Sequence, residues 1–247
     1  MLTFKQYLLE KREKEDVPLD EKEILRLFSG DFSDSLALIS HHRGVLFRGE
    51  SAAKTGIKII KQATTDRTPK EDGEHYNPLL DTNPANAAWP KRARSTFVTN
   101  DEHHAKLFGK VYYAFPENNT KVAVLPKHDM WDMQVELYHG ASKSMHRLSS
   151  EFRYLGLDPK GLTTHNLKDR ISQLQDPIVN MLNNMLDPER VFSYDTLKVE
   201  LISDMRKLAD IATKGSYHEM WFEGRCLLIE PSILHAAAPI LKREGLI

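Results

Sequence analysis

One arginine of the chain stands where it could bind an anion. In the segment GVLFRGE, the apolar run Val45–Phe47 predicts a buried strand, and Arg48 and Gly49 follow it directly. A planar guanidinium holds phosphate or carboxylate oxygens through paired hydrogen bonds and stays charged at any working pH. A glycine beside it lets the backbone approach a ligand closely, because no side chain intrudes. The segment therefore predicts an anion-binding position at the end of a strand.

Two later segments place hydroxyl groups and a carboxylate at the starts of other predicted strands. RSTFVTND begins one strand with Ser95, Thr96 and Phe97, and SYHEMWFEG begins another with Glu219. A fixed carboxylate can stabilise positive charge that develops during a reaction, and a hydroxyl group can orient the carboxylate. The three segments together could therefore bind an anionic group and promote chemistry beside it.

Each of these residues alone has an ordinary structural explanation. Arg48 could pair with Glu50, and Glu219 could be a solvent-facing strand residue, with Glu223 or Glu230 in its proposed role. The order of the three segments, each in a matching strand context, favours a joint site.

The elements that must position these residues are those of a mixed α+β domain. Predicted strands cover residues 45–47, 57–63, 96–98, 111–115, 121–125, 219–222 and 225–229. Predicted helices cover residues 1–16, 19–28, 33–41, 101–109, 133–138, 143–154, 167–185, 194–212 and 231–243. Glu223-Gly224, between the last two strands, is typical of a hairpin turn. Residues 64–94 hold four prolines and are predicted to form an irregular loop.

These elements predict one α+β domain over residues 1–247. The N-terminal helices occupy residues 1–40, and a mostly helical insertion occupies residues 131–214. The 247 residues are enough for one large domain with its own core.

Composition limits the kinds of partner. Lysine and arginine number 34 against 35 aspartates and glutamates, so no overall field draws the chain to nucleic acid or to an anionic membrane. No apolar run reaches membrane-spanning length. Cys226 is the single cysteine, which excludes an internal disulfide. We expect no membrane association.

No metal site is predicted. His103 and His104 are adjacent and diverge by roughly 100° on a helix, so they cannot share an ion. Asp129, Asp132 and Glu136 are interpreted as a solvated helix face. Trp89 and the basic residues within KRAR (91–94) could meet an acidic partner or nucleic acid, but a solvated loop is the favoured interpretation. The phosphate-loop, GxGxxG, HExxH and GxSxG motifs are absent.

The order of the three segments resembles that of the ADP-ribosyltransferases of the Arg-Ser-Glu (cholera-toxin-like) class. In that class an aromatic-arginine pair ends one strand, a Ser-Thr-Ser-like motif begins a second, and a catalytic glutamate begins a later one. STFVTND, the downstream VYYAFP and the upstream DRTP are similar to the transferase-like proteins of tailed phages. The resemblance covers residues 40–130 and 212–230. It implies a split β-sandwich of two small sheets with flanking helices, and NAD as co-substrate.

The resemblance also implies roles for individual residues. Arg48 would hold the NAD phosphates or the adjoining ribose, Ser95 would orient, and Glu219 would stabilise the oxocarbenium-like ribose, much as in glycoside hydrolysis. Tyr217, in the 213–218 loop, would meet the acceptor. The residues implied in NAD binding are Arg48, Gly49, Arg67, Ser95, Thr96 and Phe97.

Two departures from the family pattern leave the acceptor open. Phe97 stands where the family has a second hydroxyl, and Tyr217 stands where enzymes that modify arginine have a second glutamate. The expected acceptor is a host or phage macromolecule, either protein or nucleic acid. The expected location is the cytoplasm of the host cell or the interior of a phage virion.

Two other functions fit the same pattern. One is a non-catalytic phage virion protein built on a decayed transferase fold. Residues 1–16 resemble capsid-targeting segments of phage internal proteins, with Leu8-Leu9-Glu10 as the cleavage point. The other is an enzyme similar to RNA 2′-phosphotransferases, which would need a basic surface for RNA.

Overall fold

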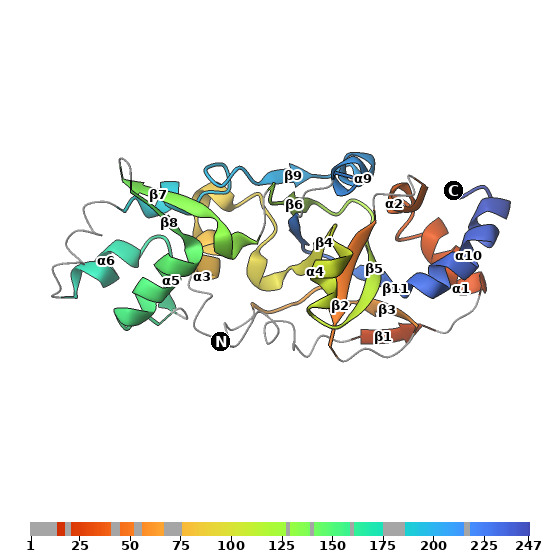
Figure 1. The fold of residues 1–247 in the computed structure, drawn as a ribbon, viewed down its shortest axis with the longest axis horizontal. Coiled ribbons are helices and arrows are strands. Elements are labelled where there is room, and N and C mark those ends of the chain that lie inside the picture. Colours follow the sequence, from red (N-terminus) through yellow and green to blue (C-terminus); the bar gives the residue numbers. More distant parts are fainter. Residues whose placement is uncertain are drawn as a thin grey trace.

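The protein is an α+β molecule with one large antiparallel sheet and groups of helices beyond it (Figure 1). The computed structural model describes residues 14–17, 21–40, 45–51, 56–66, 76–126, 129–138, 141–158, 161–174, 186–214 and 218–247. Among these residues, every helix is too short or too polar to cross a lipid bilayer.

In the part of the chain that the structure describes, nine strands form the large sheet in the order β1-β3-β11-β5-β2-β4-β10-β6-β9. Their bounds are β1 Lys14–Val17, β2 Leu46–Glu50, β3 Ile57–Ile60, β4 Thr96–Thr99, β5 Lys110–Pro116, β6 Val122–Val124, β9 Glu200–Ile202, β10 Glu219–Phe222 and β11 Cys226–Ile229. All neighbouring strands are antiparallel.

The sheet narrows sharply between β2 and β4. These strands pair through Phe47 and Thr99 alone among the described residues, whereas β2 pairs with β5 from Leu46 to Glu50. The sheet therefore consists of two halves, β1-β3-β11-β5-β2 and β4-β10-β6-β9, joined at one point. The sequence predicted two small sheets, and the structure joins its two halves into one continuous ladder.

The prediction of a hairpin at Glu223-Gly224 is wrong. The strands on either side of it exist, but β10 lies between β4 and β6 whereas β11 lies between β3 and β5. Both edges of each strand are therefore already paired. Gly224, with φ of 127°, turns the chain from one half of the sheet to the other.

Two hydrophobic cores lie on opposite faces of the β4-β10-β6 half. Val98 and Met220 are paired across β4 and β10 and belong to the first core. Phe97 and Trp221, one residue along each strand, are also paired and belong to the second core. Both faces of this half are therefore buried, which explains its nearly continuous apolar sequence.

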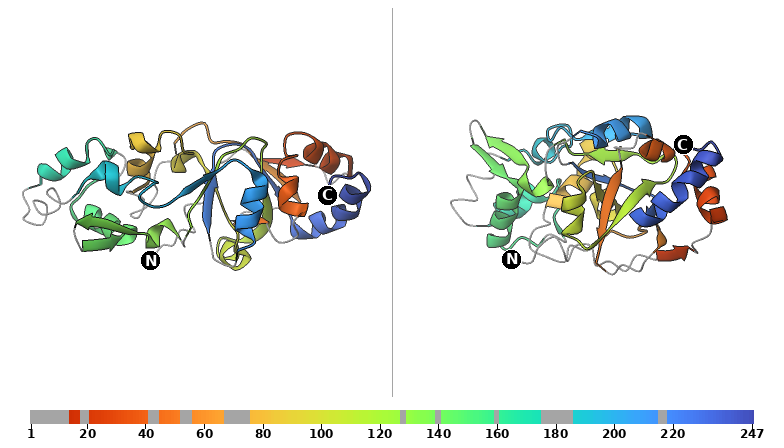
Figure 2. Two further views of the ribbon diagram at one scale, coloured as in Figure 1. Left: turned by 90° about the horizontal axis from the view of Figure 1, so that it is seen from above. Right: turned by 45° about the vertical axis from the view of Figure 1, so that its right-hand side comes forward.

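The two cores are completed by different helices. The first core takes α1 Glu21–Ser29, α2 Leu36–Ser40, α9 Met205–Ala212 and α10 Pro231–Arg243. The second takes α3 Tyr76–Thr82, α5 Met145–Tyr154, α6 Leu167–Ser172 and α8 Pro188–Val191. Helices α5 and α6 lie at one end of the molecule, α1 and α10 lie at the other, and α9 lies beside α2 (Figures 1 and 2). A short helix, α4 Glu102–Lys106, packs on β2 and β5.

The insertion at residues 131–214 is less helical than predicted. Gln134–Tyr138 is strand β7, paired with β8, Ala141–Ser144, in a separate two-stranded sheet. Val135 and Leu137 are buried, whereas Gln134 and Glu136 are exposed. This alternation has the period of a strand, not of a helix.

The helix predicted over residues 194–212 is also interrupted. Lys198 has φ of 56°, in the left-handed region that an α-helix excludes, and β9 follows at Glu200–Ile202. The helix begins only at Met205, where the Asp204 side chain accepts a hydrogen bond from the Arg206 amide.

The N-terminal region, predicted as helices over residues 1–40, contains a strand. Lys14–Val17 forms the edge strand β1 along β3, because the outer edge of β3 offers unpaired backbone groups. The loop predicted at residues 64–94 likewise contains α3 and two 3-10 turns, η2 Pro84–Asn86 and η3 Arg92–Arg94. Leu8-Leu9-Glu10 lies outside the described residues.

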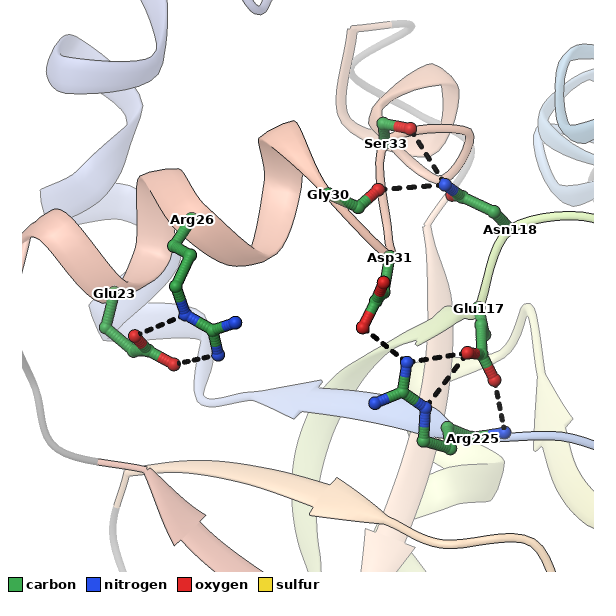
Figure 3. Close-up of polar contacts among 8 residues, drawn as sticks. All are labelled: Glu23, Arg26, Gly30, Asp31, Ser33, Glu117, Asn118 and Arg225. Atoms are coloured by element: carbon green, nitrogen blue, oxygen red, sulfur yellow. Dashed lines mark hydrogen bonds and ion pairs between the residues drawn. The ribbon is translucent and has the colours of Figure 1, made fainter.

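A polar cluster fastens the turn after α1 to the sheet (Figure 3). Arg225, at the start of β11, lies 2.5 Å from an Asp31 carboxylate oxygen and 2.6 Å from one of Glu117. The Asn118 side chain donates to the Gly30 carbonyl at 2.8 Å and to the Ser33 hydroxyl at 3.0 Å. The N-terminal helices are thus anchored to the β5-β6 turn.

Candidate active site

A small cleft lies at the junction of the two half-sheets. Its volume is about 30 Å³, and it is lined by Phe47, Arg48, Gly49, Phe97, Val98, Thr99, His104, Ala105, Phe108 and Glu219. The strands β2, β4 and β10 supply most of these residues, and α4 and the turn that follows it supply the rest. Two of the three predicted catalytic residues, Arg48 and Glu219, therefore share one cleft.

The start of α4 is fixed by two capping hydrogen bonds. The Asp101 carboxylate accepts from the amides of His103 at 2.8 Å and His104 at 3.2 Å. The Asp101 amide in turn donates to the Thr99 hydroxyl at 3.0 Å. Thr99 therefore ends β4 and begins the turn that holds the helix beside the cleft.

Arg48 bridges the two half-sheets and is only 4% exposed. Its Nε donates to Glu50 Oε1 at 2.7 Å, and its Nη1 donates to the Phe97 backbone carbonyl at 2.8 Å. The ion pair with Glu50 is the ordinary structural role considered from the sequence. Arg48 also lines the cleft. It extends from β2 to the Phe97 carbonyl on β4, and the cleft lies between these strands.

Gly49 serves the packing of α4. A Cβ atom at this position would lie 2.0 Å from the Ala105 carbonyl oxygen and 2.9 Å from the Phe108 Cβ. The glycine therefore admits the backbone of a helix close to β2, in addition to lining the cleft.

Glu219 is a buried carboxylate held at both oxygens. Arg92 Nη1 lies 2.6 Å from Oε1, and the Met130 amide donates to Oε2 at 3.0 Å. Burial alone would raise the pKa of Glu219, but the Arg92 charge, the Asp129 hydrogen bond and the Met130 amide together lower it. Glu219 is therefore ionised at neutral pH.

Arg92 was interpreted from the sequence as part of a solvated basic loop, and that interpretation is wrong. The residue has no exposed surface, and its Nε donates to Asn77 Oδ1 at 2.8 Å. Its guanidinium carbon lies 4.6 Å from the ring centre of Trp221 and 4.8 Å from that of Phe97. Aromatic residues that accept a stacked cation were the signal in the sequence; Phe97 is near in the chain, but Trp221 lies far along it.

Asp129 was interpreted as a solvated helix residue, yet it lies beside Glu219. It caps the turn η4, Met130–Asp132, by accepting from the Trp131 amide at 3.1 Å. Burial and the negative charge of Glu219 raise the pKa of Asp129 to about 8. At neutral pH a protonated Asp129 therefore stands next to an ionised Glu219.

His104 lines the cleft from the side of the helix. Burial lowers the pKa of His104, against the opposing effects of the Asp101 and Glu219 charges. The imidazole is therefore predominantly neutral at pH 7.

The other predicted residues have different surroundings. Ser95 is buried at the end of η3, where its hydroxyl donates to the Lys91 carbonyl at 2.7 Å. Thr96 is buried opposite Phe222. Arg67 and Tyr217 lie outside the described residues.

Thr99 is the hydroxyl residue that the sequence reasoning missed. It pairs with Glu219 across β4 and β10 and with Phe47 across β2 and β4. Alternation along the strand places it on the same face as Phe97. That period-two spacing was the signal that could have identified Thr99.

Comparison with known proteins finds no match among family models, curated proteins or solved structures. Within the described ranges, no group of three histidine, cysteine, aspartate or glutamate side chains is arranged to hold a metal ion.

Proposed function

We propose that this protein is an NAD-dependent mono-ADP-ribosyltransferase that modifies a macromolecular acceptor, protein or nucleic acid, and that it is encoded by a phage. One observation carries the proposal: Arg48, Thr99 and Glu219 come from three neighbouring strands and line a single cleft. The order of arginine, hydroxyl and glutamate is that of the family that the sequence resembles.

The form of the sheet supports the same fold. Two antiparallel halves meet at the Phe47-Thr99 pair, as expected of a split sandwich made of two small sheets. The cleft lies at this junction, with β2 on one side and β4 and β10 on the other.

The side chains suit the two ends of the reaction. Arg48 offers a guanidinium for the phosphates or the adjoining ribose of NAD. Glu219, ionised and fixed, would stabilise positive charge on the ribose as the bond to nicotinamide breaks. Nicotinamide would leave with the bonding electrons, and the acceptor nucleophile would attach to the ribose carbon and lose its proton.

The cleft must widen before NAD can bind. A volume of about 30 Å³ is close to that of one water molecule. Pockets that hold ligands as large as NAD usually have volumes of about 300 Å³ or more, roughly ten times the volume of this cleft. The side chains of the cleft suit NAD chemically. The cleft would open at the single residue pair that joins β2 and β4 in the described residues.

The first test is incubation of the purified protein with labelled NAD and a host-cell lysate. Transfer of label to protein or nucleic acid is expected, and Glu219→Gln should abolish it while NAD still binds by calorimetry. Glu223→Gln is the matched control, because Glu223 lies four residues along and accepts from the Lys91 amide at 3.0 Å. A fully active Glu219→Gln variant would disprove the role of Glu219.

A second function is favoured by the closed cleft and by the buried pairing of Glu219 with Arg92. These features also fit a non-catalytic virion or interaction protein on a decayed transferase fold. Absence of label transfer, of nicotinamide release and of NAD binding would support that function and overturn the transferase proposal.

A further inference from the structure

We infer that Arg92 is a positioning residue that holds Glu219 as a carboxylate and fixes its direction at the edge of the cleft. This inference rests on the proposed function, because it assigns the support of the same glutamate. It also gives a role to α3, which packs in the second core.

Both ends of the Arg92 guanidinium are engaged. Nε donates to Asn77 Oδ1 at 2.8 Å, and Nη1 lies 2.6 Å from Glu219 Oε1. The rigid planar fork therefore sets the position of one Glu219 oxygen from an anchor in α3. The Met130 amide sets the position of the other oxygen at 3.0 Å.

The plane of the guanidinium is confined by aromatic rings. Its central carbon lies 4.6 Å from the ring centre of Trp221, 4.8 Å from that of Phe97 and 5.7 Å from that of Tyr76. Trp221 is itself held, because its indole nitrogen donates to the Pro90 carbonyl at 3.1 Å. A lysine could supply charge here, but not the stacked plane or the separate hydrogen bond from Nε to Asn77.

The backbone that carries Arg92 is fastened to the same helix as Asn77. The amides of Arg92 and Ala93 donate to the two carboxylate oxygens of Asp81 at 2.7 and 2.8 Å. Asn77 and Asp81 both belong to α3, which packs in the second core. The region between β3 and β4 therefore supports the carboxylate on β10.

Other ionisable groups face the same site from three elements. They are Asp129 from the turn before η4, His104 from α4 and Arg48 from β2. Asp129 and His104 are largely neutral near pH 7, and Arg48 is paired with Glu50. Among the residues that the structure describes, Arg92 is thus the cation in direct contact with Glu219.

The first test does not need catalysis. Urea unfolding is measured for the wild type, Arg92→Gln, Glu219→Gln and the double variant. Arg92→Gln should lower the unfolding midpoint, and adding Glu219→Gln should restore part of the loss, because an unpaired buried charge is removed. Additive effects of the two substitutions would overturn the contact on which the inference rests.

The second test is the pH profile of nicotinamide release from NAD. In Arg92→Gln the acid limb should move up by about one pH unit or more, since buried Glu219 would then take up a proton more readily. Arg92→Lys, which keeps the charge, should retain the acid limb of the wild-type pH profile. Its kcat should fall about tenfold, because the Glu219 carboxylate would be oriented less precisely. Arg94→Gln is the control, because Arg94 pairs with Asp66 at the surface.

The outcomes separate the two proposals. Turnover by the wild type with an unmoved acid limb in Arg92→Gln would overturn the positioning role alone. If Arg92→Gln does not fold, an Arg92→Lys variant with wild-type kcat would overturn it equally. No turnover by the wild type would overturn the proposed function, and the role of Arg92 in catalysis with it.

Discussion

Thr99 and Glu219 lie directly opposite each other on the adjacent antiparallel strands β4 and β10. Thr99 is also paired with Phe47 of β2, so this one row of the ladder crosses all three strands of the candidate site. The backbone position of Glu219 is therefore fixed by the narrow joint between the half-sheets.

Thr99, rather than Ser95, should be the hydroxyl that transfer activity requires. Thr99→Val should reduce label transfer by about tenfold or more, since a hydroxyl in the cleft is lost, whereas Thr99→Ser should keep most of it. Ser95→Ala should leave transfer near wild type, because Ser95 is not among the residues that line the cleft and its hydroxyl donates to the Lys91 carbonyl. The reverse ranking of the Thr99→Val and Ser95→Ala rates would show that Ser95 is the functional hydroxyl.

Arg48→Ala should weaken folding as well as NAD binding. Removal of one partner of a buried ion pair typically costs about 3–5 kcal/mol, and Glu50 would be left without the contact at 2.7 Å. The Arg48→Ala/Glu50→Gln double variant should recover part of this stability in urea unfolding. It should still bind NAD more weakly than wild type by calorimetry. Unchanged affinity in that folded variant would remove Arg48 from the binding site.

Gly49→Ala should destabilise the protein by about 1–3 kcal/mol or more, because the added Cβ meets the Ala105 carbonyl at 2.0 Å and backbone must move. Gly161→Ala is the matched control, since no atom lies within 4 Å of the added Cβ. Thermal unfolding compares the two variants. Equal melting temperatures would mean that α4 does not pack on β2 as described.

Deprotonation of Asp129 should lower the free energy of unfolding as pH rises. Its pKa is raised from 3.8 to about 8, so the folded state keeps a proton that the unfolded state releases. This stabilisation is complete below about pH 4 and is lost as pH rises through about 8, with a slope of up to about 1.4 kcal/mol per pH unit.

The measurement is urea unfolding between about pH 7 and 8, a window above the pKa of Asp81, which burial raises to about 6. Asp129→Asn should flatten the dependence, because asparagine cannot ionise. Asp132→Asn, at an exposed position of the same turn, should leave the slope as in wild type. If the unfolding free energy of Asp129→Asn varies with pH as steeply as that of wild type, the proton that the folded state retains is bound by a different group.

The strands of the site could be predicted from the sequence, because short apolar runs between polar turns specify β2, β4, β5, β6, β10 and β11 locally. Their order in the sheet could not. The turn at Glu223-Gly224 has hairpin chemistry, but β10 and β11 each find better partners far away in sequence. Strand order that depends on partners far away in the chain cannot be predicted from the local sequence pattern.

The supporting residues of the site were harder to predict than Arg48 and Glu219. Arg92 lies between Lys91 and Arg94 in KRAR, which locally resembles a solvated loop. Its burial depends on Asn77, Trp221 and Glu219, three residues from different segments. Gly49 was predicted to let the backbone approach a ligand, and the structure gives the close packing of the α4 backbone as another reason for the glycine.

The separation of β10 from β11 has a consequence for how the chain folds. These are the last two strands in sequence, and each is an interior strand of a different half of the sheet. During synthesis, β3 and β5, and likewise β4 and β6, must keep an unpaired backbone edge until residues 219–229 emerge from the ribosome. Both halves should therefore be completed together and late, through contacts of high sequence separation that make folding slow. Their open edges before that moment are the stage at which nascent chains would be most prone to aggregate.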